Sequence, residues 1–357
     1  MRILQLIDTL EAGGAERVAV NIANALVDEV EASFLCVTRR EGALKNNLKL
    51  EVGYLFLERS FTLDISAIKR LNAFVKHHSI THIHAHATSF FIGVIIKILN
   101  PKLKFIWHDH YGESEFLEQR PKTVLKLCSR YFNHIFCVNS KLKVWAEQNL
   151  KTKSVSYLPN FAELDHQPAI TKLKGVSNKR IVCLANLRPQ KDHLTLLKAF
   201  KHLNHEYPEW SLHLIGQDFQ DDYSKSIVNY IKEAQLSKSV FVYGSCPDIR
   251  AILSQCDIAV LPSKSEGLPL ALVEYGLAKR PTIATNVGDC NLVISNESEG
   301  ILIEPQNSSV LKTAIKIYIN TPEKAKLAGE QLNLKVKAEF SKQAAIKKIV
   351  NVYQSIS

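Results

Sequence analysis

Two glutamates, eight positions apart, are the residues of this sequence with the clearest capacity for binding chemistry. Glu266 and Glu274 lie in the stretch LPSKSEGLPLALVEYGLAKRPTIAT. Between them, Gly267, Leu268 and Pro269 mark a change from loop to helix, because proline suits a first helical turn, where the N–H it lacks would be unpaired. The free N–H groups and positive dipole end of such a helix favour a diphosphate. The two carboxylates can accept hydrogen bonds from sugar and ribose hydroxyls on either side of it.

A solvated helix start with two surface glutamates is the alternative for such a spacing. The apolar strand that follows Asp257 and ends at Pro262 favours the ligand site, since ligands of open α/β sheets bind at the carboxyl ends of strands.

A second group of polar residues follows another strand, in the segment CLANLRPQKDHLTLLKAF. The strand ends near Ala185, the turn carries Asn186, Arg188 and Lys191, and Asp192 is predicted to be the N-cap of the next helix. Cations at this position are well placed to bind phosphate oxygens. For Lys191 we favour a functional role, whereas for Arg188 a solvated turn explains the residue equally well.

The segment EAGGAERV follows the first predicted strand, and Gly13 and Gly14 let the backbone approach a ligand closely. It lacks the G-x-G-x-x-G spacing, and Arg39 and Arg40, not an acidic residue, end the second predicted strand. A dinucleotide site is therefore disfavoured, and a plain strand-to-helix turn remains the alternative.

Histidines alternate in two further predicted strands, at His82, His84 and His86 and at His108 and His110. Imidazoles suit zinc, so metal binding is one interpretation. No cysteine or glutamate completes a ligand set, and we expect core or cleft histidines and no metal site. Of the five, His110 is best placed to line a cleft. The glycine spacings of a nucleophile elbow or of a Walker lysine loop are absent.

Composition narrows the class of protein. The net charge of +10 is spread over both halves without a dense basic tract, which disfavours nucleic acid as a partner. Seven cysteines form no CxxC pair, so they indicate free thiols in a reducing compartment. The N-terminus has the pattern of a strand and not of a signal peptide, and we expect a cytoplasmic protein.

Short apolar runs alternate with longer amphipathic ones along the whole chain, which predicts βαβ units and parallel sheets. We expect an α/β protein with two doubly wound, Rossmann-like domains that face an interdomain cleft. The N-terminal domain should cover residues 1–165, a polar linker 166–178, and the C-terminal domain 179–357. A final helical stretch from Pro322 to about Val352 has no strand after it and is a candidate to pack back on the N-terminal domain.

Taken together, these motifs resemble the family 4 retaining glycosyltransferases of GT-B fold. The resemblance rests on GGAERV, IWHDHYG at 106–112, YLPN at 157–160, NLRPQKDH at 186–193, the EGLPLALVE block and NVGD at 286–289. Their order and domain-scale spacing are specific, although no single piece is.

The resemblance implies a hexosyltransferase that moves a sugar from a nucleotide-diphosphate donor to an acceptor hydroxyl, with retention and without a metal or cofactor. The C-terminal domain would hold the donor and the N-terminal domain the acceptor. It implies that Lys191 contacts the diphosphate, Glu274 the ribose and Glu266 the donor sugar. Gly14 would approach the diphosphate, and His110 would line the donor-sugar pocket.

One residue departs from the family pattern: Asn186 stands where the family has an arginine that neutralises the leaving diphosphate. Arg188, two positions on, is a candidate replacement. The missing arginine makes a non-catalytic nucleotide-sugar-binding protein one alternative to a glycosyltransferase. A nucleotide-sugar epimerase or a phosphorylase-like enzyme of the same fold is another, although neither is expected to carry the EGLPLALVE block.

The expected acceptor is a sugar or a lipid-linked saccharide of cell-surface polysaccharide or glycolipid synthesis. The apolar run Phe90–Phe105 and the nearby Lys122, Lys126 and Arg130 have two interpretations. One is a core helix beside a solvated face, and the other is peripheral docking on the anionic inner face of a membrane.

Overall fold

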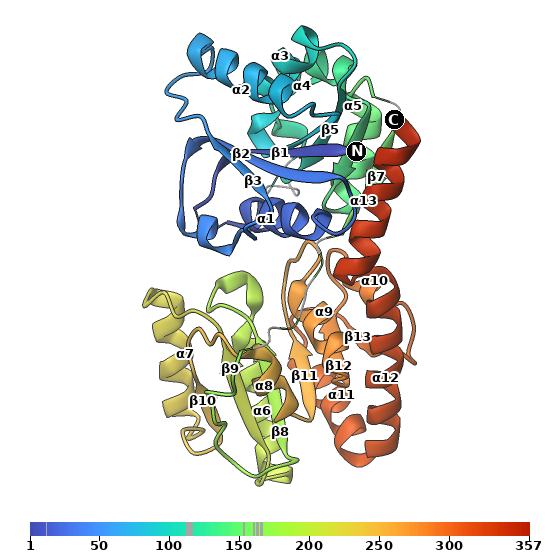
Figure 1. The fold of residues 1–357 in the computed structure, drawn as a ribbon. Helices are drawn as coiled ribbons and strands as arrows, with labels where there is room; N and C mark the ends of the chain where they lie inside the picture. The colour runs from blue at the N-terminus through green and yellow to red at the C-terminus, as the bar shows by residue number, and fades with distance from the viewer. Residues whose placement is uncertain (12, 112–116, 153, 160, 162–163, 165–166) are drawn as a thin grey trace. The chain divides into compact units, whose positions relative to one another are not determined.

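The computed structural model describes residues 1–357 except 12, 112–116, 153, 160, 162–163 and 165–166 (Figure 1). The chain divides into two compact units. One unit holds Met1–Asn160 together with Ala345–Ser357, and the other holds Phe161–Ala344. The last residues of the chain therefore belong to the first unit.

The first unit is built on a seven-stranded parallel sheet with the order β3-β2-β1-β4-β5-β6-β7. Its strands are β1 (Arg2–Thr9), β2 (Ala32–Arg40), β3 (Gly53–Phe56), β4 (His82–His86), β5 (Lys104–Asp109), β6 (His134–Cys137) and β7 (Val155–Tyr157). Parallel neighbours need crossover connections. The helices are α1 (Gly14–Leu26), α2 (Ile65–His77), α3 (Phe90–Leu99), α4 (Thr123–Cys128) and α5 (Ser140–Asn149).

The second unit has a six-stranded parallel sheet with the order β10-β9-β8-β11-β12-β13. Its strands are β8 (Arg180–Leu184), β9 (Ser211–Ile215), β10 (Val240–Val242), β11 (Ile258–Leu261), β12 (Thr282–Thr285) and β13 (Ile301–Ile303). Its helices are α6 (His193–Glu206), α7 (Asp222–Glu233), α8 (Ile249–Ser254), α9 (Leu270–Leu277), α10 (Cys290–Val293), α11 (Ser308–Asn320) and α12 (Pro322–Glu339). The two parallel, doubly wound sheets confirm the predicted fold class.

Two predicted helices differ from those observed. The sequence pattern predicts one helix over 121–132, but α4 ends at Cys128 and a short 3₁₀ turn follows over Ser129–Tyr131. In this turn the Ser129 carbonyl accepts a hydrogen bond of 2.5 Å from the Thr152 hydroxyl. The final helical stretch is two helices, α12 and α13 (Lys342–Ile356). The Ser341 hydroxyl accepts from the Ala344 N–H at 3.1 Å, which starts a new helix at this point.

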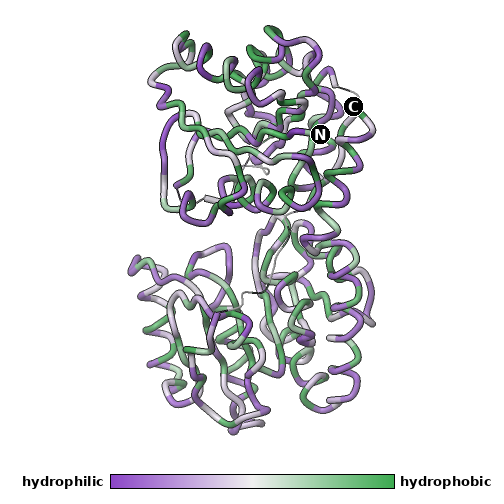
Figure 2. The backbone as a smooth tube through the Cα atoms, viewed as in Figure 1, coloured by the Kyte–Doolittle hydropathy of each residue, from purple (hydrophilic) through white to green (hydrophobic). Residues whose placement is uncertain are grey.

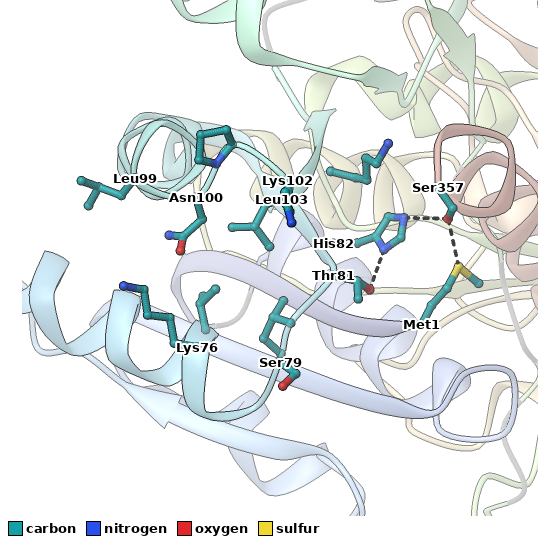
Figure 3. A pocket seen from close by; sticks show the side chains of 14 residues that line it. Met1, Lys76, Ser79, Thr81, His82, Leu99, Asn100, Lys102, Leu103 and Ser357 are labelled. Carbon is teal, nitrogen blue, oxygen red and sulfur yellow. Dashed lines mark hydrogen bonds between the residues drawn. The ribbon is translucent and has the colours of Figure 1, made fainter.

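Polar groups of helix α13 and of Ser357 after it form hydrogen bonds to the first sheet. Tyr353 is fully buried, and its hydroxyl lies 2.6 Å from Nδ1 of His84. At the end of the chain, the His82 ring bridges the Thr81 hydroxyl, at 2.8 Å, and the Ser357 hydroxyl, at 3.3 Å (Figure 3). The Lys348 ammonium donates to the Tyr157 carbonyl of β7.

The described residues between Phe161 and Asn178 form no helix or strand. Part of this segment is nevertheless ordered against the second unit. The Asp248 carboxylate accepts from the N–H groups of Ile170 and Thr171, at 2.8 and 2.7 Å, and from the Thr171 hydroxyl. These bonds attach the segment to the start of α8.

Candidate functional site

A cavity of about 430 Å³ lies in the second unit at the carboxyl ends of β8 and β11. These neighbouring strands are the point at which the strand order of the sheet reverses, where ligands of doubly wound folds bind. Six residues predicted from the sequence line the cavity: Asn186, Lys191, Glu266, Leu268, Pro269 and Glu274.

Lys191 and Glu266 form an ion pair at the cavity wall. The Lys191 ammonium lies 2.6 Å from Oε1 and 2.8 Å from Oε2 of Glu266. The Glu266 side chain is only 7% exposed and that of Lys191 is 24% exposed. The Ser263 hydroxyl also donates to Oε1, at 2.6 Å. A nearly buried carboxylate thus holds a more exposed ammonium in place, where an anion can reach it.

The loops after β8 and β11 are joined at two further points. The Lys264 N–H donates to the Gln190 carbonyl at 2.7 Å, and the Lys264 ammonium lies 3.5 Å from Asp192. Asp192 does not cap α6 in the predicted way. Its backbone is left-handed, with φ 49°, and its carboxylate accepts from the Thr195 hydroxyl at 2.7 Å instead of from a backbone N–H.

A third loop supports Glu266 from behind. Gly288 has φ +55°, and a Cβ placed on it would lie 2.0 Å from the Glu266 carbonyl oxygen. The next N–H, of Asp289, donates to the Gly267 carbonyl at 3.0 Å. Glycine at 288 therefore lets the NVGD loop lie directly against the EG segment.

Helix α9 begins in the cavity wall. Pro269 is its N-cap and not its first helical residue, and no side chain caps the first turn. The Leu272 N–H donates to the Pro269 carbonyl at 3.1 Å, and the N–H groups before it in α9 have no partner within the helix, so they can meet a ligand. Glu274, one turn further on, lines the same cavity and is partly exposed.

Buried contacts fix the orientation of α9. The Tyr275 hydroxyl accepts from the Leu184 N–H at 2.7 Å and donates to the Val260 carbonyl at 3.3 Å, which joins the helix to β8 and β11. On the far side, the Asn333 amide donates to the Gly276 and Leu277 carbonyls. A Cβ on Gly276 would lie 2.6 Å from Val336 of α12, so glycine allows this close packing.

The turn after β8 places Asn186 and Arg188 differently. The Asn186 amide oxygen accepts from the Gln217 N–H at 2.8 Å, so the residue links the ends of β8 and β9 while it lines the cavity. Arg188 is exposed, does not line the cavity, and its guanidinium carbon lies 4.7 Å from the centre of the Phe219 ring. Gly267 lies in the loop beside Glu266 and is not a lining residue either.

Gly14 and His110 belong to the first unit. Gly14 is the first residue of α1, and a Cβ on it would meet no atom within 4 Å. Packing within the first unit therefore does not require a glycine at this position. His110 directly follows β5, and its Nε2 lies 3.0 Å from Nδ1 of His86. Burial lowers the pKa of His110 to about 3 and keeps the ring neutral at pH 7.

Among the described residues, one trio could hold a metal ion: buried His84, His86 and His108, whose candidate ligand atoms lie within 4.8 Å of one another. Burial lowers the pKa of all three imidazoles well below the ordinary value. Both ring nitrogens of His86 are hydrogen-bonded, to Gln5 and to His110, so an ion would have to displace one of these bonds.

Some lining residues were not anticipated from the sequence: Gly216, Ser245, Cys246 and Ile249. Gly216 directly follows β9, and Ser245 and Cys246 lie after β10. Their position after strands of the same parallel sheet was the available signal, because all carboxyl ends meet at one edge.

Two larger cavities lie elsewhere. One, of about 750 Å³, is bordered by Thr81, His82 and Lys104 where β4 and β5 begin, with Leu99 and Lys102 nearby (Figure 3). The other, of about 630 Å³, lies where β8 and β11 begin in the second unit. Both are at the amino ends of strands, and neither contains a predicted site residue.

Comparison with known proteins gives one model for each half of the chain. A model described as Glycosyltransferase Family 4 matches residues 12–166, and one described as Glycosyl transferases group 1 matches residues 170–335. An uncharacterized glycosyltransferase of Haemophilus influenzae is 24% identical over 351 residues, which cover 97% of this chain and 96% of that protein.

A second relative is the Escherichia coli UDP-Gal:alpha-D-GlcNAc-diphosphoundecaprenol alpha-1,3-galactosyltransferase, 24% identical over 322 residues, 82% of this chain and 81% of that protein. Among solved structures, Anabaena HepE in complex with UDP superposes with a TM-score of 0.82 at 18% identity, covering 99% of this chain and all of that one. These matches confirm the GT-B fold and the family resemblance.

The support that Gly288 gives to Glu266 is tested by a pair of matched substitutions. Gly288→Ala and Gly244→Ala both place a side chain at positive φ, but only the first creates a clash, since nothing lies within 4 Å of the Cβ position on Gly244. We expect Gly244→Ala to lower the free energy of unfolding by about 1 kcal/mol. Gly288→Ala should lower it by at least about 2 kcal/mol more, because overpacking adds to the backbone cost. Equal values in urea denaturation would contradict this account of the loop.

Proposed function

This chain belongs to the GT-B glycosyltransferases of the family 4 type, and we propose that it transfers a sugar from a nucleotide-diphosphate donor to an acceptor hydroxyl with retention. One observation carries the proposal. The cavity at the ends of β8 and β11 combines an ammonium, two carboxylates and an uncapped helix start, which together suit a nucleoside diphosphate and a sugar.

In this proposal the diphosphate lies against the start of α9 and the Lys191 ammonium. Glu274 accepts hydrogen bonds from the ribose hydroxyls, and Glu266 contacts the donor sugar. The ion pair with Glu266 holds Lys191 before the donor arrives, so little reorganisation is needed to meet the phosphate charge.

The reaction breaks the bond between the anomeric carbon and a phosphate oxygen, and it forms a bond from that carbon to the acceptor oxygen. The acceptor O–H bond also breaks, and its proton passes to the departing phosphate oxygen. Negative charge develops on the departing diphosphate, and fixed cations and helix N–H groups stabilise it. We propose that Lys191 and the start of α9 perform this task without a metal ion. Attack by the acceptor on the face from which the diphosphate leaves would retain the configuration.

We propose that the first unit binds the acceptor and that its His110 contacts the donor sugar, as the family resemblance implies. A relative's name specifies a saccharide on diphosphoundecaprenol, and a lipid-linked saccharide is the acceptor class that we favour here. Synthesis of a cell-surface polysaccharide or glycolipid is the corresponding role.

A lipid-linked acceptor lies at a membrane, and the surface of α3 and α4 carries apolar and basic side chains that suit contact with lipid. Helix α3 is almost wholly hydrophobic (Figure 2), and its buried residues Ile92, Gly93, Val94 and Ile96 belong to the core. A Cβ on Gly93 would lie 2.4 Å from the Phe105 ring. Large apolar side chains are exposed at its end and on α4: Ile98, Leu99, Val124 and Leu127, each at least 50% exposed. Lys122, Lys126 and Arg130, all exposed, lie among them.

We propose that this basic and apolar surface of α3 and α4 docks on anionic lipid. Within the described residues, every helix is too short or too polar to cross a bilayer. Electrostatic docking of this type contributes about 1 kcal/mol per basic residue near the surface.

The role of Lys191 is tested by comparing two matched variants, Lys191→Met and Arg188→Met, with a nucleotide-sugar that the wild type turns over. Loss of a charge-stabilising group should lower kcat by about 10² to 10³ in Lys191→Met. Arg188→Met should retain near-wild-type kinetics, because the guanidinium lies on Phe219 outside the cavity. An equal loss in both variants would mean that Arg188 replaces the missing arginine. Binding without turnover by the wild type would favour the non-catalytic alternative.

Membrane docking is tested by co-sedimentation with vesicles of phosphatidylglycerol and phosphatidylcholine. The variant K122E/K126E/R130E should lose binding, whereas K324E/K326E/K337E, which reverses three exposed charges on α12, should bind like the wild type. Binding should also weaken with added salt, because screening shortens the reach of surface charge. Equal losses in the two triple variants, or binding that is indifferent to lipid charge, would refute a specific docking surface.

A further inference from the structure

A continuous chain of buried hydrogen bonds connects helix α13 to His110 inside the first unit. The Tyr353 hydroxyl accepts from the Gln5 amide N–H at 3.4 Å. The Gln5 amide oxygen lies 2.8 Å from Nε2 of His86, and Nδ1 of His86 lies 3.0 Å from Nε2 of His110. Gln5, His86 and Tyr353 have no exposed surface, so solvent does not compete for the bonds between them, and partly exposed His110 ends the chain.

The chain has a direction, because an amide oxygen only accepts. With the Gln5 oxygen facing His86, the proton of His86 must be on Nε2, and its Nδ1 carries a lone pair. That lone pair can only accept from the facing nitrogen, so His110 must carry its proton on Nε2. Nδ1 of His110 is then left as an acceptor.

A neutral imidazole is required at each step. Burial lowers the pKa of His86 well below its ordinary value and that of His110 to about 3, so neither ring is charged at pH 7. Among the described residues, no hydrogen bond to Nδ1 of His110 is formed, which leaves this atom for a ligand of the first unit.

We propose that Gln5 and Tyr353 are positioning residues that fix the tautomer of His110, so that its Nδ1 accepts a hydrogen bond from a substrate hydroxyl. The structural part of this inference concerns the first unit alone. The part that names a sugar hydroxyl rests on the proposed function.

Two substitutions at Gln5 separate tautomer control from simple packing. Gln5→Glu keeps an acceptor facing His86, so the direction of the chain is preserved. Gln5→Met has a similar size but offers no amide, and an Nε2–H on His86 would then be a buried donor without an acceptor. A buried donor without an acceptor costs free energy, so the tautomer of His86 that carries its proton on Nδ1 becomes populated. His86 then donates to Nε2 of His110, and the proton of His110 must lie on Nδ1.

The test is the ¹⁵N spectrum of the histidine rings in ligand-free protein at pH 7.5, with the His110 signals assigned by their loss in His110→Gln. In the wild type and in Gln5→Glu, we expect Nε2 of His110 to be protonated and Nδ1 to be of the imine type. In Gln5→Met, Nδ1 should gain a protonated population. A wild type with Nδ1 protonated, or a Gln5→Met spectrum identical to that of the wild type, would overturn the proposal.

Kinetics supply the second readout once a donor and acceptor are known. Loss of one substrate hydrogen bond corresponds to about a fivefold change in affinity. The KM of Gln5→Met should therefore be about fivefold higher than that of the wild type, with unchanged kcat, and the KM of Gln5→Glu should equal that of the wild type. If the wild type transfers no sugar, the proposed function fails while the ring spectra still decide the tautomer. If the spectra agree and KM is unchanged in Gln5→Met, His110 does not contact the substrate through Nδ1, and that part of the inference is refuted.

Discussion

The pairing of one ammonium with one nearly buried carboxylate is the interaction on which the candidate site depends. Lys191 and Glu266 come from loops 75 positions apart in sequence, and their contact at 2.6 Å joins the ends of β8 and β11. A partner left alone in such a site is costly, so each charge requires the other until an anion arrives. The supporting contacts of Ser263, Lys264 and Gly288 all act on the same two loops.

This arrangement follows from parallel-sheet topology. In a parallel sheet all strands end at one edge, and the reversal of strand order between β8 and β11 opens a crevice between their loops. Helix α9 then contributes an uncapped start and Glu274 to the same crevice. Tyr275 and Asn333 fix its orientation from beneath. The first unit has the same topology but uses its strands differently, since β4 and β5 carry the buried, closely packed imidazoles of His84, His86 and His108 next to His110.

The sequence was sufficient for the parts of the site that depend on local pattern. Alternating strand and helix patterns predicted both sheets, and the positions of Lys191, Glu266 and Glu274 after strands or inside a helix start predicted that they line one cavity. What could not be predicted depends on side-chain directions in turns. The stacking of Arg188 on Phe219 joins two loops, and the left-handed backbone of Asp192 accompanies an ion pair with Lys264 of a third loop. The bond from Gln5 to His86 joins residues 81 positions apart, and no local pattern indicates it.

Binding of the nucleotide part of a sugar donor in the cavity beside α9 is tested most directly by calorimetric titration with UDP, GDP and ADP. One of the three should bind the wild type at a single site. Glu274→Ala should weaken that binding by about 10- to 100-fold, the range for a hydrogen bond to a charged group. Glu233→Ala, on α7 and outside the cavity, should bind like the wild type. No binding of any of the three nucleotides, or equal affinity of Glu274→Ala and the wild type, would contradict the account.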